Sequence, residues 1–215
     1  RPQPEKAILV QREWKMQTIE QDPVSRVSIS SLYETHFIIH IGAKSERSKE
    51  LELHLKSARY VVLDTPEVAL DQQYQFYAVE VFKQLQTLLK SNPKRPVLFQ
   101  LLISQNSENV DQWRIFSGLK GMLRTAMIEN AKVKAQLIEI DDNAKSEVLA
   151  LRLIENALAP QDHIRYQELE RHICRWYEVG AAGSPAIPWK DKGVYLITGG
   201  VGGLGLIFAH EIARK

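Results

Sequence analysis

Residues Gly193-Val194-Tyr195-Leu196-Ile197-Thr198-Gly199-Gly200-Val201-Gly202-Gly203-Leu204-Gly205 are the most informative stretch of this sequence. The apolar run from Val194 to Ile197 predicts a strand, and the glycines after it predict a tight turn. A helix is then expected to begin near Leu206. The stretch therefore has the form of the first strand, turn and helix of a nucleotide-binding α/β fold.

Glycine suits such a turn for two physical reasons. A pyrophosphate can approach the backbone closely only where no Cβ intervenes, and glycine readily adopts positive φ values. The N-terminus of the following helix also offers unpaired N–H groups and the positive end of the helix dipole, which stabilise an anion. We expect the cofactor contacts to come from Thr198, Gly199, Gly202, Gly203, Leu204 and Gly205. The alternative is a glycine-rich turn that binds no ligand.

Upstream of this stretch, predicted strands alternate with predicted helices, a pattern typical of a mostly parallel sheet covered by helices. Short apolar runs predict strands at residues 7–16, 35–41, 59–64, 95–104 and 133–141, with one or two more within 163–177. Apolar residues at helical spacing predict helices at 46–56, 68–89, 111–130 and 146–159. The small, proline-containing segment around 180–188 is the clearest linker signal in the chain.

Composition excludes several classes of function. The chain has 215 residues, of which 44% are hydrophobic and 25% charged, and its formal net charge is +2. This charge gives no reason to expect nucleic acid as a partner. The sequence contains neither a transmembrane-length apolar run nor a signal peptide, and its single cysteine excludes an internal disulfide. These features favour a cytoplasmic location without a membrane partner.

The first part of the chain offers no convincing second site. His36 and His40 lie on the same face of one predicted strand, but no third metal ligand is visible, so we expect no metal. Gly42 follows that strand alone, and a single glycine predicts an ordinary turn rather than a phosphate cradle. Asp64 could resemble a ribose-binding acid, although the Pro66 that follows favours the start of a helix.

The glycine loop resembles that of the short-chain dehydrogenase/reductase superfamily. Its doubled form, Gly199-Gly200-Val201-Gly202-Gly203-Leu204-Gly205, is most similar to the ketoreductase domain of modular type I polyketide synthases. Residues 113–130, with Gly118-Leu119, Arg124 and Glu129, and the strands at 164–175 resemble the structural subdomain that precedes the catalytic half of those enzymes. The resemblance therefore implies an α/β fold: a truncated Rossmann-like sheet with flanking helices, followed by the first βα unit of a second Rossmann fold.

The same resemblance implies how the chain is divided and what its parent protein does. Residues 1–180 would be the degenerate structural subdomain, 181–192 a linker, and 193–215 the incomplete first unit of the NADPH-binding catalytic subdomain. The family reduces the β-keto group of an acyl chain on an acyl carrier protein. Its catalytic tyrosine, serine and lysine are expected beyond residue 215, so no catalytic residue is assigned and this fragment is expected to be inactive. Its implied partners are the catalytic subdomain, the neighbouring synthase domains and, through the parent, the acyl carrier protein.

Two other functions remain open on the sequence alone. The chain could be an independent α/β module that docks onto another domain or binds a ligand of its own. It could also be a complete small oxidoreductase, although no Tyr-x-x-x-Lys pair follows Gly205.

Overall fold

A computed structural model of the chain describes residues 9–19, 28–43, 46–105, 114–141, 144–167, 170–179 and 189–214. The chain divides into two compact units. The larger unit is Arg12–Trp176, and the smaller combines Arg1–Gln11 with Tyr177–Lys215. Each is described separately below.

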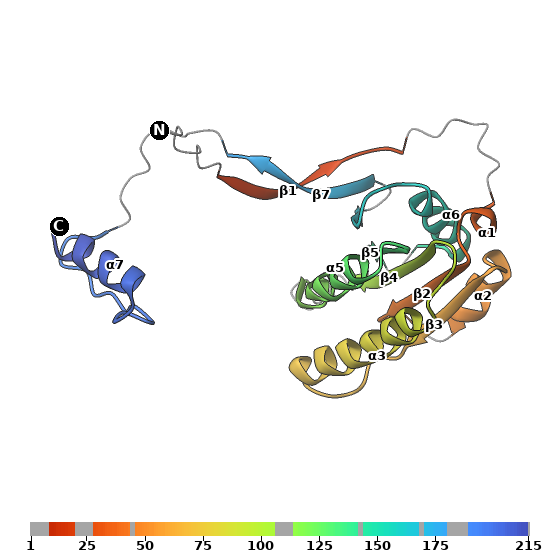
Figure 1. Cartoon of the computed structure of the whole chain (residues 1–215), viewed down its shortest axis with the longest axis horizontal. Helices are drawn as coiled ribbons and strands as arrows, with labels where there is room; N and C mark the ends of the chain where they lie inside the picture. The colour runs from red at the N-terminus through yellow and green to blue at the C-terminus, as the bar shows by residue number, and fades with distance from the viewer. Residues whose placement is uncertain are drawn as a thin grey trace. The chain divides into compact units, whose positions relative to one another are not determined.

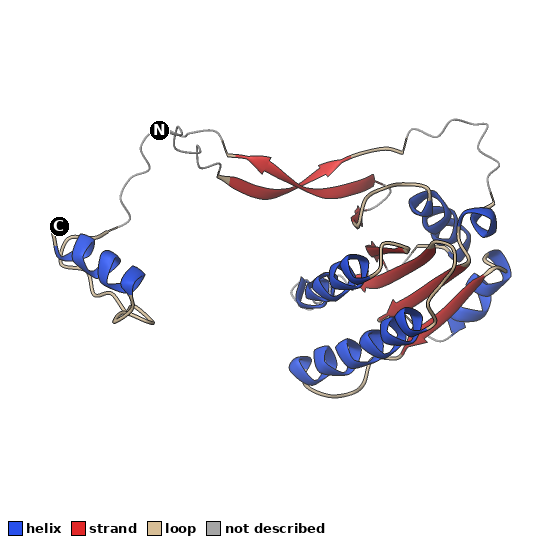
Figure 2. Cartoon of the chain, in the orientation of Figure 1, coloured by secondary structure: helices blue, strands red, loops and turns tan. Residues whose placement is uncertain are grey.

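Figure 2 shows the helices and strands. The strands are β1 (Val10–Met16), β2 (Thr35–Ile41), β3 (Ala58–Leu63), β4 (Val97–Gln105), β5 (Val133–Asp141), β6 (His163–Gln167) and β7 (Glu170–Glu178). The helices are α1 (Ile29–Leu32), α2 (Glu46–His54), α3 (Leu70–Lys90), the 3₁₀ turn η1 (Ser117–Leu119), α5 (Lys120–Glu129), α6 (Ser146–Ala157) and α7 (Gly203–Ala213). The expected strands 35–41 and 133–141 are confirmed with the same bounds.

The strands form one seven-stranded sheet in the order β1-β7-β6-β5-β4-β2-β3. Strands β2 to β6 pair in parallel with one another, whereas β7 is antiparallel to β6. After β2 the chain moves outward to β3 and then returns to the other side of β2 to form β4. This reversal of strand order is the topological switch of a doubly wound α/β fold. The expected mostly parallel α/β architecture is confirmed.

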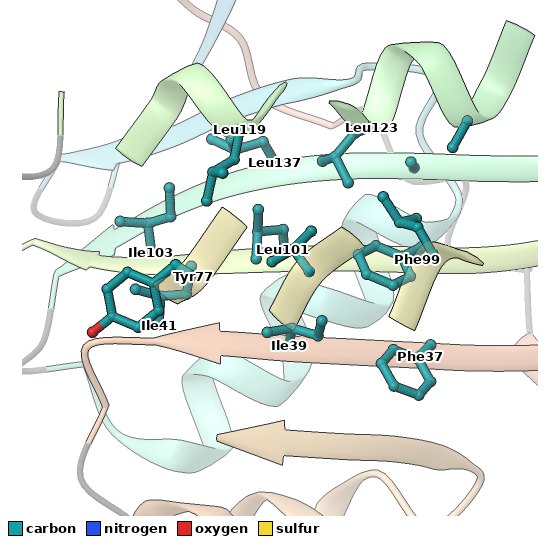
Figure 3. Packing of buried hydrophobic residues seen from close by; sticks show 14 of the residues in the cluster. Phe37, Ile39, Ile41, Tyr77, Phe99, Leu101, Ile103, Leu119, Leu123 and Leu137 are labelled. Atoms are coloured by element: carbon teal, nitrogen blue, oxygen red, sulfur yellow. The ribbon is translucent and has the colours of Figure 1, made fainter. Parts of the chain in front are cut away.

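Helices cover both faces of the central strands, with α3 and α5 on one face and α2 and α6 on the other (Figure 1). Side chains alternate between the faces because successive strand residues point in opposite directions. Phe37, Ile39 and Ile41 of β2 pack toward α3, as Figure 3 shows, whereas Ile38 packs with residues of α2 and α6. Burial on both faces explains why these strands read as continuous apolar runs.

Polar residues inside this core are hydrogen-bonded to one another. His36 Nε2 and Gln100 Oε1 are 2.7 Å apart, and Gln100 Nε2 donates to Gln136 Oε1 at 2.8 Å and to Leu153 O at 3.0 Å. Gln136 in turn donates to the carbonyl of Asn156 at 2.7 Å. The chain of bonds joins β2, β4 and β5 to α6, and it offsets the cost of burying these amides.

A second polar cluster attaches β1 to the sheet. Glu139 of β5 is fully buried, and its carboxylate accepts from Arg165 Nε at 2.5 Å and lies 2.8 Å from His163 Nε2. The Arg165 guanidinium lies 3.9 Å from the centroid of the Trp14 ring, which also contacts the His163 ring edge-on at 4.7 Å. Trp14 of β1 is thereby held against β6, whose His163 and Arg165 are in turn bound to Glu139 of β5.

Two local expectations differ from the structure. The single helix expected over 111–130 is interrupted, because helical residues 114–116 are followed by the 3₁₀ turn η1 before α5 begins. Gly118 lies in this turn, where an added Cβ would be 3.4 Å from Tyr74 Oη. The 3₁₀ turn therefore packs closely against α3. The start of the expected helix, 111–113, lies outside the described residues. The short helix α1 occupies part of a segment expected to be only a connection.

Replacing Leu101 with Ala should destabilise the chain by about 2–5 kcal/mol, because it leaves a cavity among fully buried side chains. Leu151→Ala is the matched control, since that side chain is 60% exposed on α6. Urea unfolding followed by circular dichroism measures both free energies. Equal losses for the two variants would contradict the central position of Leu101.

Stability should fall as the pH decreases through about 6.5, the ordinary histidine pKa, in part because of His36. Burial lowers the pKa of His36 below its ordinary value of 6.5, so the unfolded chain binds a proton that the folded chain refuses. The loss begins as the pH falls through the unfolded value and continues down to the folded one. His36→Gln should reduce this slope of unfolding free energy against pH, which urea unfolding at several pH values measures. An unchanged slope would contradict the contribution of His36.

Candidate cofactor loop

The glycine-rich stretch folds as a turn leading into α7 in the smaller unit. Residues 198–201 form the turn, Gly202 is the N-cap of α7, and Gly203, Leu204 and Gly205 form its first turn. The structure thus brings the predicted cofactor-contacting residues together at one helix end. The helix begins three residues before the expected start near Leu206.

Two glycines are required by the turn itself. Gly199 has a φ of +70°, a value that side chains other than glycine rarely adopt. A Cβ on Gly205 would lie 2.5 Å from Gly199 O and 2.6 Å from Gly200 Cα, so the first helical turn packs directly on the backbone of the loop. Gly205 therefore fixes how closely the loop and helix approach each other.

Gly203 differs from Gly205, because an added Cβ there would meet nothing within 4 Å. Its surroundings in this chain leave space above the backbone, as a phosphate cradle requires. The first helical hydrogen bond runs from Leu206 N–H to Gly202 O at 2.9 Å, and the N–H groups of Gly203, Leu204 and Gly205 precede it. Such N-terminal amides, together with the helix dipole, favour an anionic ligand. The residues present therefore fit the pyrophosphate of a dinucleotide.

The strand expected at Val194 to Ile197 is not formed. No residue described in the structure pairs with this segment, and Val194 and Leu196 are 99% and 94% exposed. An isolated apolar run cannot complete its backbone hydrogen bonds without a neighbouring strand. The sequence identified a segment suited to a sheet, but its pairing partners are not among the described residues.

Sequence reasoning also missed a local support before the loop. The Trp189 and Tyr195 rings meet edge-on at 5.5 Å, and the Lys190 backbone N–H donates to Tyr195 Oη. Gly193 lies under this ring, where a Cβ would approach Tyr195 Cε2 to 2.8 Å. In the sequence, the aromatic residues on either side of Gly193 were the available signal for this contact. The contact folds residues 189–195 back on themselves ahead of the glycine loop.

The histidines considered as metal ligands have other partners. His36 bonds to Gln100, while His40 lies between Tyr60 Oη and Ser104 Oγ, the latter at 2.9 Å from Nε2. The described ranges contain no group of three or more residues that could hold a metal ion. Nor does any helix in the portion of the chain covered by the structure have the length and apolar character to cross a membrane.

Comparison with known proteins relates the chain to large synthases. No family model matches it. Polyketide synthase PksN of Bacillus subtilis (strain 168) is 34% identical over 209 residues, or 97% of this chain and 4% of PksN. PksL of the same strain is 37% identical over 185 residues, or 85% of this chain and 4% of PksL. The chain therefore spans only a small part of the curated relatives it matches.

Solved structures narrow the match to one kind of domain. A ketoreductase domain from the bacillaene assembly line superimposes with a TM-score of 0.75 and 30% identity, covering 97% of this chain and 46% of that structure. The chain belongs with the ketoreductase domains of modular polyketide synthases. The first ketoreductase of the tylosin synthase, at 15% identity and a TM-score of 0.61, shows the same fold. The family expected from the glycine loop is confirmed.

This ketoreductase segment covers about half of the solved domains, 46% and 48% in the two cases above. The matches extend through the larger unit, where no cofactor loop was expected. Gly42 at the end of β2 has a φ of +79° and faces Ser104, with a Cβ position 3.5 Å from Ser104 Cβ. The glycine loop before α7 therefore remains the candidate cofactor site.

Gly205→Ala should open the loop of the ketoreductase segment, because its new Cβ would clash with the backbone at Gly199 and Gly200. The expected result is a shift of the Gly199 and Gly200 amide resonances in a ¹⁵N–¹H correlation spectrum. Gly203→Ala is the matched control, since its Cβ meets open space and should leave those two resonances near their original positions. Similar shifts in both variants would contradict the described packing of loop on helix.

Proposed function

We propose that residues 1–180 form the non-catalytic structural subdomain of a polyketide synthase ketoreductase. In this proposal 181–192 link it to 193–215, the first unit of the catalytic subdomain. The support is the 30% identity to a ketoreductase domain that extends over 97% of the chain. The larger compact unit, Arg12–Trp176, is close to the proposed first part. Most of the linker lies outside the described residues.

The intact domain would reduce the β-keto group of an acyl chain carried by an acyl carrier protein, with NADPH as hydride donor. Thr198, Gly199, Gly202, Gly203, Leu204 and Gly205 would hold the cofactor at its pyrophosphate. Their part is binding, through backbone amides at the helix end and through the absence of Cβ atoms. No residue of this chain is assigned a proton-transfer or hydride-transfer step.

The larger unit would support the catalytic subdomain and space it from neighbouring synthase domains. Its described polar interior argues for a structural role, because Gln100, Gln136 and Glu139 all bond to protein groups rather than face a substrate. Burial and complete hydrogen bonding make such groups rigid. A rigid, inert unit is what a scaffold for a separate catalytic half requires.

The test compares this chain with a version extended to the length of the solved ketoreductase domains. The extended protein should oxidise NADPH in the presence of a β-ketoacyl thioester, and the 215-residue chain should not. Gly205→Val should abolish NADPH binding by the extended protein, measured by fluorescence titration. Gly121→Ala is its control, because Gly121 lies on α5 with nothing within 4 Å of its Cβ position.

Two results would contradict the proposal. Micromolar NADPH binding by the 215-residue chain would show that its cofactor site is already complete. A folded extended protein that binds NADPH but reduces no β-ketoacyl thioester would show that the fold does not carry out the proposed reaction. Circular dichroism and thermal unfolding establish that each protein is folded before activity is measured.

A further inference from the structure

Basic residues gather where β4 and β5 begin, in the larger unit. Lys94 and Arg95 precede β4, while Lys132 precedes β5 and Lys134 is its second residue. Lys132 Nζ donates to Pro93 O at 2.8 Å, and Val97 N–H donates to Lys132 O at 2.9 Å. Lys134 pairs in register with Leu98. These four residues are called the basic edge below.

The charges of the basic edge are poorly balanced by neighbouring carboxylates. Within the described ranges, none of its side chains has a carboxylate within salt-bridge distance. Glu34 already accepts the backbone N–H groups of Lys94 and Arg95 at 2.9 and 2.8 Å. Arg95 uses its guanidinium to bond the carbonyls of Ser30 and Ser31.

Two further acids lie near the basic edge. Asp162 is occupied by other cations, with Lys120 Nζ and Arg124 Nε each 3.2 Å from its carboxylate. Glu129 ends α5, shortly before Lys132. Cations therefore outnumber carboxylates here, although the net charge of the whole chain is only +2. The excess is local, and it makes this end of the sheet attractive to an acidic partner.

A cavity of about 340 Å³ opens beside the basic edge, with Lys134 among its lining residues. Leu98, Met127, Leu158 and Pro160 supply apolar surface, and Asp162, which is paired with Lys120 and Arg124, also lines the cavity. Its polar groups are largely engaged with one another. Tyr33 Oη donates to Ala157 O at 2.8 Å, and Gln136 Nε2 donates to Gln161 O at 2.9 Å.

We propose that the basic edge and this cavity together bind an acidic protein segment, which inserts one apolar side chain into the cavity. The carboxylates of the segment would pair with Lys94 and Lys134, and its apolar side chain would contact Met127 and Leu158. Because Tyr33 and Gln136 already bond to protein groups, an apolar side chain that enters beside them leaves neither without a hydrogen bond. Charge supplies orientation, and burial of the apolar anchor supplies affinity.

A protein segment fits these features better than nucleic acid. Nucleic acid would require basic residues along a longer track and exposed rings for base stacking. The aromatic residue lining the cavity, Tyr33, is only partly exposed and its hydroxyl is already bonded to Ala157. The proposed surface uses no residue of the glycine loop, so it goes beyond the proposed reductase function and can fail independently of it.

The probe is a labelled acidic helical peptide of about four turns, with glutamates four residues apart and a single phenylalanine. Fluorescence anisotropy with the 215-residue chain should show saturable binding at roughly 0.05 M salt, weakening several-fold at roughly 0.3 M. Lys94→Glu with Lys134→Glu should weaken binding at least about tenfold, because two attractions become repulsions. These substitutions retain the bond between Lys132 and Pro93.

The matched control is Lys49→Glu with Lys56→Glu, which gives the same change in net charge at exposed positions in and after α2. This variant should bind within about twofold of the original chain, since its charges lie away from the basic edge. Replacing the peptide's phenylalanine with alanine should also weaken binding, because the apolar anchor is lost. Thermal unfolding confirms that both protein variants are folded.

Four outcomes would overturn the proposal. The peptide could fail to bind, or it could bind the two charge-reversal variants equally. Unchanged affinity of the alanine peptide would exclude the cavity as the anchor site. Binding of duplex DNA that exceeds peptide binding and is lost in the Lys94 and Lys134 variant would assign the surface to nucleic acid instead.

Discussion

Burial of the central strands on both faces is the constraint on which the larger unit depends. A parallel strand cannot be joined to its neighbour by a short turn, so each connection passes over the sheet, and helices cover both faces. Alternate residues of β2, β4 and β5 then need apolar partners on opposite sides. The same burial forces polar residues such as Gln100 to find protein partners. Core packing and the hydrogen-bond network thus have one cause.

The sequence predicts most of this unit because double burial leaves a strong local signal. The run at β2 is apolar and the run at β5 alternates in part, and the predicted bounds of both agree with the structure. Local signals fail where tertiary contacts decide. The helix is interrupted before α5 at Gly118, which packs closely against Tyr74 of α3. Val194 to Ile197 has the composition of a strand, yet pairing requires a neighbour that sequence composition cannot supply.

The candidate sites differ in how far they could be predicted. The glycine loop is contiguous in sequence, so its spacing identified the family and the helix end that fits a phosphate. The spacing does not distinguish Gly205, where a Cβ would clash with the loop backbone, from Gly203, where a Cβ would meet open space; only the surrounding atoms do. The basic edge was not predicted, because its residues come from two distant parts of the sequence, and the pairing of β4 with β5 places the starts of these strands side by side. The cavity beside it likewise combines residues from several elements.

The attachment of Trp14 through Arg165 and Glu139 also bears on the order of biosynthesis. Trp14 lies in β1, which precedes the other strands of the sheet in the sequence, whereas its cation partner Arg165 lies in β6. A ribosome therefore completes β2 to β5 and their covering helices long before it supplies the anchor for β1. Closing so long a loop carries an entropic cost that the earlier, more local contacts avoid. Of the seven strands of this sheet, β1 precedes the others in the sequence, yet we expect it to be among the last to acquire its native contacts.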